Sequence, residues 1–253
     1  MSQPIARAER LTFGPGGSRR EPVELPLEAP LRIEVNGKHL ATLMRLPGDD
    51  RELALGFWLT EGLIRSRVDV ARVEHCPDDP NLLRMTLAGE LPERRPMAIG
   101  TACGGILGAG LPEPLTGGPV ARAADLMRMP AKLQRHQPVR ERVGVVHGAG
   151  VFGADGELLA AYEDIGRHNA MDKAIGWCAL GGERLDDKLL LITGRGSAEM
   201  LIKAARAGVR VLCTLANVTA LGAELADVLG VTLVARLGDD HLEVFSHPKR
   251  VRE

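Results

Sequence analysis

A dense group of polar side chains between residues 162 and 173 is the part of this sequence best equipped for chemistry. It reads Tyr-Glu-Asp-Ile-Gly-Arg-His-Asn-Ala-Met-Asp-Lys and combines acids, bases and an amide in one short segment. An apolar, strand-like run precedes it and a helix-like run follows, and in open α/β sheets ligands bind where a strand leads into a helix. A helix cap with Asp164 or Asn169 would explain a single polar turn. The density of polar groups, and the close backbone approach that Gly166 allows, favour a ligand site.

Two further turns in the second half of the chain have the same strand-to-helix pattern, at residues 194–197 and 217–219. If the parallel strands lie side by side, their carboxyl ends form one rim, where helix N-termini present free N–H groups and positive dipole ends. Four side chains could add charge for phosphates there: Arg167, Lys173, Arg195 and Arg236. The sequence matches neither the Walker pattern nor a GxGxxG after a strand, which argues against an ordinary ATPase or dehydrogenase.

Cys103 is the second candidate for chemistry, because it lies in a run of small residues with five glycines between positions 98 and 110. Cysteine is usually a small buried hydrophobe, and the apolar surroundings of Cys178 and Cys213 suit that interpretation. A glycine-rich loop rarely buries a side chain. An accessible thiol among backbone N–H donors can have a lowered pKa and act as a nucleophile.

Composition limits the classes of function. The 253 residues are 45% hydrophobic and 26% charged, with a net charge of −1, which offers no global field for nucleic acid or a membrane. There is no run of 18 apolar residues and no apolar segment of signal-peptide type, so we expect a cytoplasmic protein with reduced cysteines. The cysteines form no Cys-x-x-Cys pair, so no metal is expected, and His147 and His168 are the only plausible ligands near the rim.

Four segments are expected along the chain. Residues 1–22 are rich in Gly, Pro and Arg and predict a disordered tail. Residues 23–97 predict a small α+β domain, with a hairpin at Asn36-Gly37 and a helix capped by Asp49 or Asp50. Residues 98–120 form a Gly/Pro-rich loop that carries Cys103.

The last segment, residues 121–253, alternates strands and helices. After a first helix the order of elements is β-β-α-β-α-β-α-β, which predicts a three-layer α/β sandwich with a mixed sheet. The strands are expected at 143–152, 157–162, 188–193, 209–215 and 231–237, and the helices at 121–137, 169–180, 198–207 and 219–229.

Three stretches resemble the signatures of one family, the formate dehydrogenase accessory sulfurtransferases (FdhD). They are 47–50 with 53–57 and 60–62, then 163–170 with Asp172-Lys173, and 194–200. The resemblance covers nearly the whole chain beyond residue 22. It implies a cytidine-deaminase-like α/β domain without the zinc site of the deaminases, in keeping with the missing Pro-Cys-x-x-Cys motif.

The resemblance also implies a function. The chain would accept sulfur from a cysteine desulfurase as a persulfide on Cys103 and pass it to the molybdenum bis-guanine-dinucleotide cofactor, for use by the formate dehydrogenase catalytic subunit. A homodimer is expected. The family's second loop cysteine is Ile106 in this chain, which argues against a two-cysteine relay. A non-catalytic chaperone that holds the cofactor and docks it to the apo-enzyme therefore stays open as an alternative.

The rim is the expected cofactor site, with GDP as a fragment of the ligand. The residues expected to bind are His147, Arg167, His168, Asn169, Lys173, Arg195, Ser197, Val234, Ala235, Arg236, Leu237, Gly238 and Asp239. Of these, His147 and the 234–239 segment follow from the resemblance. A guanine base needs an acceptor for its N1–H and N2–H₂ groups, which Asp239, or less favourably Asp164, would provide.

Overall fold

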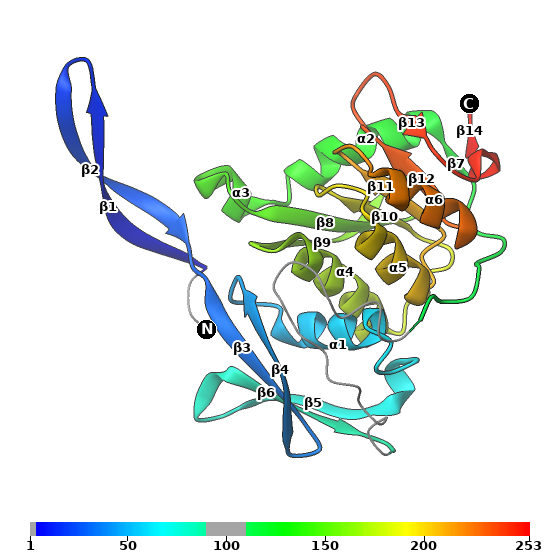
Figure 1. Ribbon diagram of the computed structural model, residues 1–253, viewed down its shortest axis with the longest axis horizontal. Coiled ribbons are helices and arrows are strands. Elements are labelled where there is room, and N and C mark those ends of the chain that lie inside the picture. The colour runs from blue at the N-terminus through cyan, green and yellow to red at the C-terminus, as the bar shows by residue number, and fades with distance from the viewer. Residues whose placement is uncertain (1–3, 90–109) are drawn as a thin grey trace.

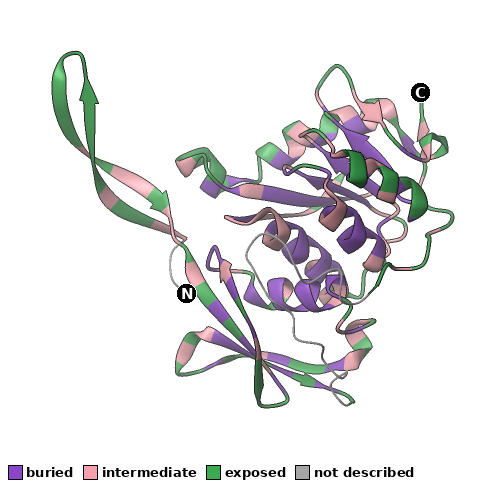
Figure 2. Cartoon of the chain, in the orientation of Figure 1, coloured by how far each residue is buried: buried purple, intermediate pink, exposed green. Residues whose placement is uncertain are grey.

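The computed structural model describes residues 4–89 and 110–253. Two sheets lie on either side of a pair of packed helices, α1 (Asp50–Thr60) and α4 (Arg167–Gly181), and a long hairpin projects from the N-terminal end (Figure 1). Figure 2 shows that α1 and α4 are largely buried, whereas most of the hairpin is exposed.

The larger sheet has six strands in the order β13-β12-β11-β10-β8-β9. Strands β10, β11 and β12 are parallel, and β8 is antiparallel to both β10 and β9, so β9 runs in the direction of β10. The predicted mixed sheet is therefore confirmed. The strand bounds are β8 His147–Phe152, β9 Leu158–Asp164, β10 Leu189–Ile192, β11 Val211–Thr214, β12 Thr232–Ala235 and β13 Glu243–Val244.

Helices cover both faces of this sheet. Leu190 and Ile192 pack with α4, α5 (Ala198–Arg206) and α6 (Ala220–Val228), while Leu189 and Leu191 pack with α2 (Ala123–Gln134). Because β10 is buried on both faces, its four residues are all apolar. A short helix, α3 (Pro138–Val143), occupies the residues before β8 and was not predicted. The three-layer, cytidine-deaminase-like form stays a prediction.

The smaller sheet has four strands in the order β4-β3-β6-β5. The hairpin at Asn36-Gly37 is confirmed, with both residues at positive φ (49° and 77°), as a two-residue turn of this kind requires. Asp49 occupies the N-cap of α1, but neither predicted acid caps the helix through its side chain: Asp50 instead binds Arg45. The strand bounds are β3 Ala29–Val35, β4 Lys38–Arg45, β5 Val70–Cys76 and β6 Asp79–Leu87. Whether 23–97 and 121–253 are independent domains stays a prediction.

The expectation of a disordered tail was wrong for residues 5–22. Strands β1 (Ile5–Gly14) and β2 (Gly17–Pro26) pair antiparallel over their full length. The glycines and proline that suggested disorder form the turn, since Gly14 pairs with Gly17. Cross-strand ion pairs such as Arg10–Glu21 support the arm, and Arg142 holds its base through Glu24 at 2.7 Å. A short parallel pair joins β7 (Ala121–Arg122) to β14 (Val251–Arg252), and two 3₁₀ turns lie at Arg67–Asp69 and Pro248–Arg250.

Helices α1 and α4 approach each other through two glycines. A Cβ atom on Gly56 would lie 1.8 Å from the carbonyl oxygen of Asp172, and one on Gly176 would lie 1.8 Å from that of Glu52. Any side chain at either glycine would therefore force the helix backbones apart.

A cluster of buried charges lies at the C-terminal end of α1, where it contacts α4 and α5. Lys203 of α5 lies 2.9 Å from Asp172 of α4 and 3.0 Å from Glu61 at the end of α1, and it donates to Thr60 at 2.8 Å. Because all four side chains are buried, each charge depends on the others for its stability.

We predict that Gly56→Ala and Gly176→Ala each lower the free energy of unfolding by about 1–3 kcal/mol, because the added methyl group has no space. Urea denaturation measures this change. Gly181→Ala is the matched control, since a Cβ there meets only the flexible Glu183 side chain at 3.7 Å. Stabilities of the two test variants equal to that of the control would contradict the packing described.

Candidate functional site

The carboxyl ends of β9 to β12 lie along one edge of the larger sheet, as predicted, together with the amino end of β8. Backbone hydrogen bonds join the turns that follow these strands: Gly196 donates to Asn217 at 3.1 Å, and Arg236 donates to Ala216 at 3.1 Å. Thr193 donates to Gly148 at 3.0 Å, next to His147. This rim, defined by residues 147, 165–168, 193–199, 214–219 and 236–239, is continuous across the ends of five strands.

Arg167 lies across the turn after β10. A Cβ atom on Gly194 would be 3.1 Å from both Cβ and Cδ of Arg167, so the glycine leaves room for the arginine side chain. The guanidinium Nη2 is 4.0 Å from Glu199 Oε2, and 28% of the side chain is exposed. The N-terminus of α4 and the turn that leads into α5 are therefore in direct contact.

His168 packs beside Arg167 and faces the same carboxylate, with its Nε2 2.8 Å from Glu199 Oε2. Burial, helped by the positive charges of Arg167 and Lys203, lowers the pKa of His168 to about 3. The ring is thus neutral at pH 7. Burial is also the main cause of the lowered pKa of His147, whose Nδ1 is 3.3 Å from the Thr193 hydroxyl.

Three buried polar atoms of the rim make no hydrogen bond within the described part of the chain: Arg167 Nε, His168 Nε2 and Ser197 Oγ. A buried polar group left without a partner costs about 1–3 kcal/mol, which a ligand or water can recover. The N-caps of α4 and α5, Gly166 and Ser197, also make no side-chain cap, whereas Thr219 caps α6. The first-turn N–H groups of α4 and α5 are therefore available to an anion.

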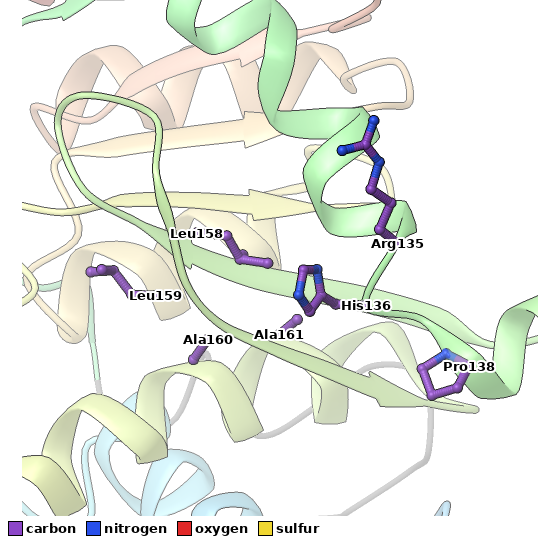
Figure 3. Close-up of a pocket in the computed structure, with 7 residues that line it drawn as sticks. All are labelled: Arg135, His136, Pro138, Leu158, Leu159, Ala160 and Ala161. Carbon is purple, nitrogen blue, oxygen red and sulfur yellow. The ribbon is translucent and has the colours of Figure 1, made fainter.

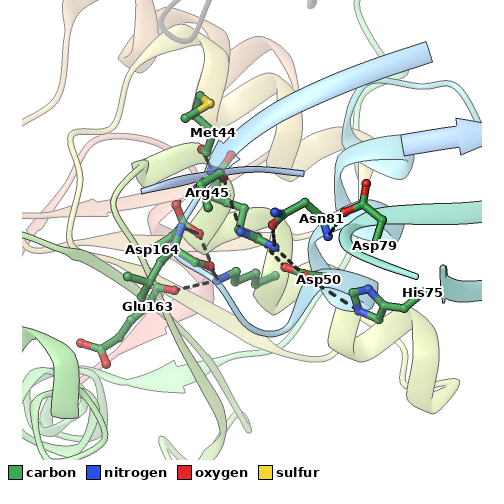
Figure 4. Close-up of polar contacts among 12 residues, drawn as sticks. Met44, Arg45, Asp50, His75, Asp79, Asn81, Glu163 and Asp164 are labelled. Carbon is green, nitrogen blue, oxygen red and sulfur yellow. Dashed lines mark hydrogen bonds and ion pairs between the residues drawn. The ribbon is translucent and has the colours of Figure 1, made fainter. Parts of the chain in front are cut away.

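Two expected binding residues, Asn169 and Lys173, belong instead to a polar network around the buried Asp164. Figure 4 shows Met44, Glu163 and Asp164 of this network. Lys173 Nζ is 3.0 Å from Asp164 Oδ2 and 3.1 Å from the carbonyl oxygens of Leu46 and Glu163. Its three protons thus already have acceptors, and only 1% of the residue is exposed. The prediction that Lys173 contacts a phosphate was therefore wrong.

Asn169 and Asp164 belong to the same network. The Asn169 amide donates to the Met44 carbonyl at 2.8 Å and to Asp164 Oδ1 at 3.0 Å. Asp164 is fully buried and also accepts from the backbone of Leu46 and Gly166. It has no capacity left to read a guanine base, so Asp239 is the remaining candidate of the two.

The 234–239 segment divides between core and surface. Val234, Ala235 and Leu237 are buried in the sheet, so their side chains are not available to a ligand. Arg236, at a positive φ of 48°, lies 3.5 Å from Glu243. Arg195, Arg236 and Asp239 are exposed, and Gly238 is partly exposed.

The structure therefore brings together His147, Arg167, His168 and Ser197, and adds Glu199, which sequence reasoning missed. The signal for Glu199 was its position in the first turn of α5, directly after the Gly-Arg-Gly-Ser turn.

Cys103 lies outside the described residues. The other three cysteines are buried, and burial raises the pKa of Cys178 and Cys213 to about 12, so both are protonated at neutral pH.

Within residues 4–89 and 110–253, no three His, Cys, Asp or Glu side chains are grouped so that they could hold a metal ion. No described helix is both long and apolar enough to cross a membrane.

A shallow hollow beside β9 is separate from the rim (Figure 3). Its lining residues are Arg135, His136, Pro138, Leu158, Leu159, Ala160 and Ala161. None of the predicted site residues contributes to it.

Comparison with known proteins identifies the family. The model of the FdhD/NarQ family matches residues 26–252. The chain belongs to the FdhD/NarQ family. It is 38% identical to the sulfur carrier protein FdhD of Mycolicibacterium paratuberculosis, over 97% of both chains. It is 36% identical to that of Sulfolobus acidocaldarius, over 89% of this chain and 90% of the relative.

A solved structure supports the same conclusion. A formate dehydrogenase accessory protein from Desulfotalea psychrophila superposes with a TM-score of 0.82 at 25% identity, covering 99% of this chain and all of the other. The FdhD resemblance seen in the sequence motifs is thus confirmed, and the rim belongs to an FdhD/NarQ fold.

Proposed function

We propose that this chain is a sulfur carrier, which takes sulfur from a cysteine desulfurase as a persulfide on Cys103 and passes it to the molybdenum bis-guanine-dinucleotide cofactor used by formate dehydrogenase. The observation that carries the proposal is the match, over nearly the full length of both chains, to relatives named sulfur carrier protein FdhD. Cytoplasmic location and a homodimer stay predictions alongside it.

The first described residue after the Cys103 loop, Gly110, is joined to the far end of a helix that begins at the rim. Gly110 is held by Arg206, whose Nη2 donates to its carbonyl oxygen at 2.7 Å. Arg206 ends α5, a helix of nine residues that begins at the rim and is therefore about 14 Å long. Seven residues of extended chain span at most roughly 25 Å. The number of residues between Gly110 and Cys103 is therefore compatible with a transfer of sulfur to a ligand at the rim.

The chemistry needs one accessible thiolate, and the buried Cys178 and Cys213 cannot supply it, given pKa values of about 12. The Cys103 thiolate would attack the terminal sulfur of the desulfurase persulfide, so that one S–S bond forms and one breaks without net oxidation. Release of the carried sulfur as sulfide takes two electrons from a thiol reductant and restores the Cys103 thiol.

The rim suits the diphosphate of the cofactor. The chain has a net charge of −1, so an anion site must be local. The uncapped N-termini of α4 and α5, the buried donors on Arg167 and Ser197, and the exposed Arg195 offer such a local site. Asp239 is the expected acceptor for the guanine N1–H and N2–H₂ groups.

A second function, the cofactor chaperone without sulfur chemistry, is favoured by one observation. Ile106 replaces the second cysteine of the family's loop motif. Such a chaperone would use the same rim and the same client enzyme, but it would not need Cys103.

The sulfur-carrier function predicts that Cys103 alone gains a persulfide when the protein is incubated with a cysteine desulfurase and cysteine. Mass spectrometry of the intact and digested protein measures the added sulfur. Cys103→Ala should lose both the persulfide and the activation of formate dehydrogenase, whereas Cys76→Ala, which removes a buried thiol, should keep both. Full activation by Cys103→Ala would exclude the carrier and leave the chaperone.

The cofactor site predicts that GDP binds more tightly than ADP in calorimetric titrations. Arg195→Ala should weaken GDP about tenfold to a hundredfold, as expected for the loss of a charged phosphate contact. Arg184→Ala is the matched control, because Arg184 is also exposed and lies outside the rim. Equal affinity for GDP and ADP would exclude guanine recognition, and identical GDP affinity in both variants would place the phosphates elsewhere.

A further inference from the structure

The Glu199 carboxylate faces both Arg167 and His168, the two rim residues with a buried nitrogen that makes no hydrogen bond in the described structure. Its Oε2 is 2.8 Å from His168 Nε2 and 4.0 Å from Arg167 Nη2, and its side chain is 23% exposed. It belongs to the first turn of α5, whereas both of its partners begin α4. This carboxylate therefore ties together the two helix N-termini that form the proposed anion site.

The nearby charge of Lys203, one turn further along α5, is already engaged. Its ammonium group contacts Asp172, Glu61 and Thr60 in the buried network. The Glu199 carboxylate therefore interacts with His168 and Arg167 rather than with Lys203.

The contact with Glu199 determines which nitrogen of His168 carries the proton. The ring is neutral at pH 7, because burial and neighbouring positive charges lower its pKa. A neutral imidazole has one N–H and one lone pair. If Nε2 carried the lone pair, it would face a carboxylate oxygen at 2.8 Å, and two acceptors would repel each other. The proton therefore belongs on Nε2.

The two groups are close but not aligned, so Nε2 makes no hydrogen bond in the described structure although Glu199 is at hydrogen-bond distance. An unpaired buried N–H costs about 1–3 kcal/mol. A small rotation of either side chain toward the other removes that cost. The same rotation leaves Nδ1 of His168 as a hydrogen-bond acceptor.

We propose that Glu199 is a positioning residue: it fixes His168 in the Nε2–H tautomer, with Nδ1 as an acceptor, and holds Arg167 against the rim. The inference rests on the proposed function, because the orientation of His168 and Arg167 matters to a ligand that binds at the rim. The tautomer of His168, by contrast, is a property of the free protein.

The test is NMR of the ¹⁵N-labelled imidazoles at pH 7 in wild type, Glu199→Ala and Glu199→Gln, with His147 as the internal reference. Wild type should show the Nε2–H form of His168. Glu199→Gln should keep it, because the amide oxygen can still accept a hydrogen bond from Nε2–H, while Glu199→Ala should give a mixture of tautomers. Glu224→Ala, which removes an exposed acid of α6, should leave the tautomer of His168 unchanged.

GDP titration of the same variants then separates this inference from the proposed function. Glu199→Ala should weaken GDP by about tenfold, the scale of one lost hydrogen bond, with partial rescue in Glu199→Gln. An unchanged His168 tautomer in folded Glu199→Ala would overturn the inference. A changed tautomer in a protein whose wild type binds no GDP would support the positioning role and refute the proposed ligand site.

Discussion

The direct backbone contact between α1 and α4 is the constraint on which the rest of this structure depends. It is possible only because Gly56 and Gly176 have no side chains. Around it lie two buried charge networks, one centred on Lys203 and one on Lys173. Removing one partner of a buried ion pair typically costs about 3–5 kcal/mol, so the position of α4 against α1 is fixed by both shape and charge.

This packing explains the arrangement of the polar stretch at 163–173. Asn169, Asp172, Lys173 and Gly176 are spaced i, i+3, i+4 and i+7, which places them on one face of α4. That face meets α1 and the end of β4, as the contacts to Met44, Thr60, Leu46 and Glu52 show. Arg167 and His168 lie on the other side, toward α5. One short motif therefore serves both to assemble the fold and to form the rim.

The sequence predicted the elements that depend on local patterns. The Asn36-Gly37 hairpin, the continuously apolar strand β10 and the line of strand ends at the rim all follow from short-range rules. It could not predict which polar residues of α4 are buried, because several of their partners come from the end of β4 and from α1, more than a hundred residues earlier. The N-terminal arm was missed for a different reason: Gly14 to Gly17 has the composition of a flexible tail but forms a tight turn.

We propose separate roles for two residues of α4 that lie two positions apart, with Arg167 in the ligand site and Asn169 in the fold. Measuring both GDP affinity and the free energy of unfolding in Arg167→Ala and Asn169→Ala tests this proposal directly. Arg167→Ala should weaken GDP about tenfold or more with little change in stability, while Asn169→Ala should lose about 1–3 kcal/mol of stability and keep its GDP affinity. The same loss of GDP affinity in both variants, with stability unchanged in both, would contradict the claim.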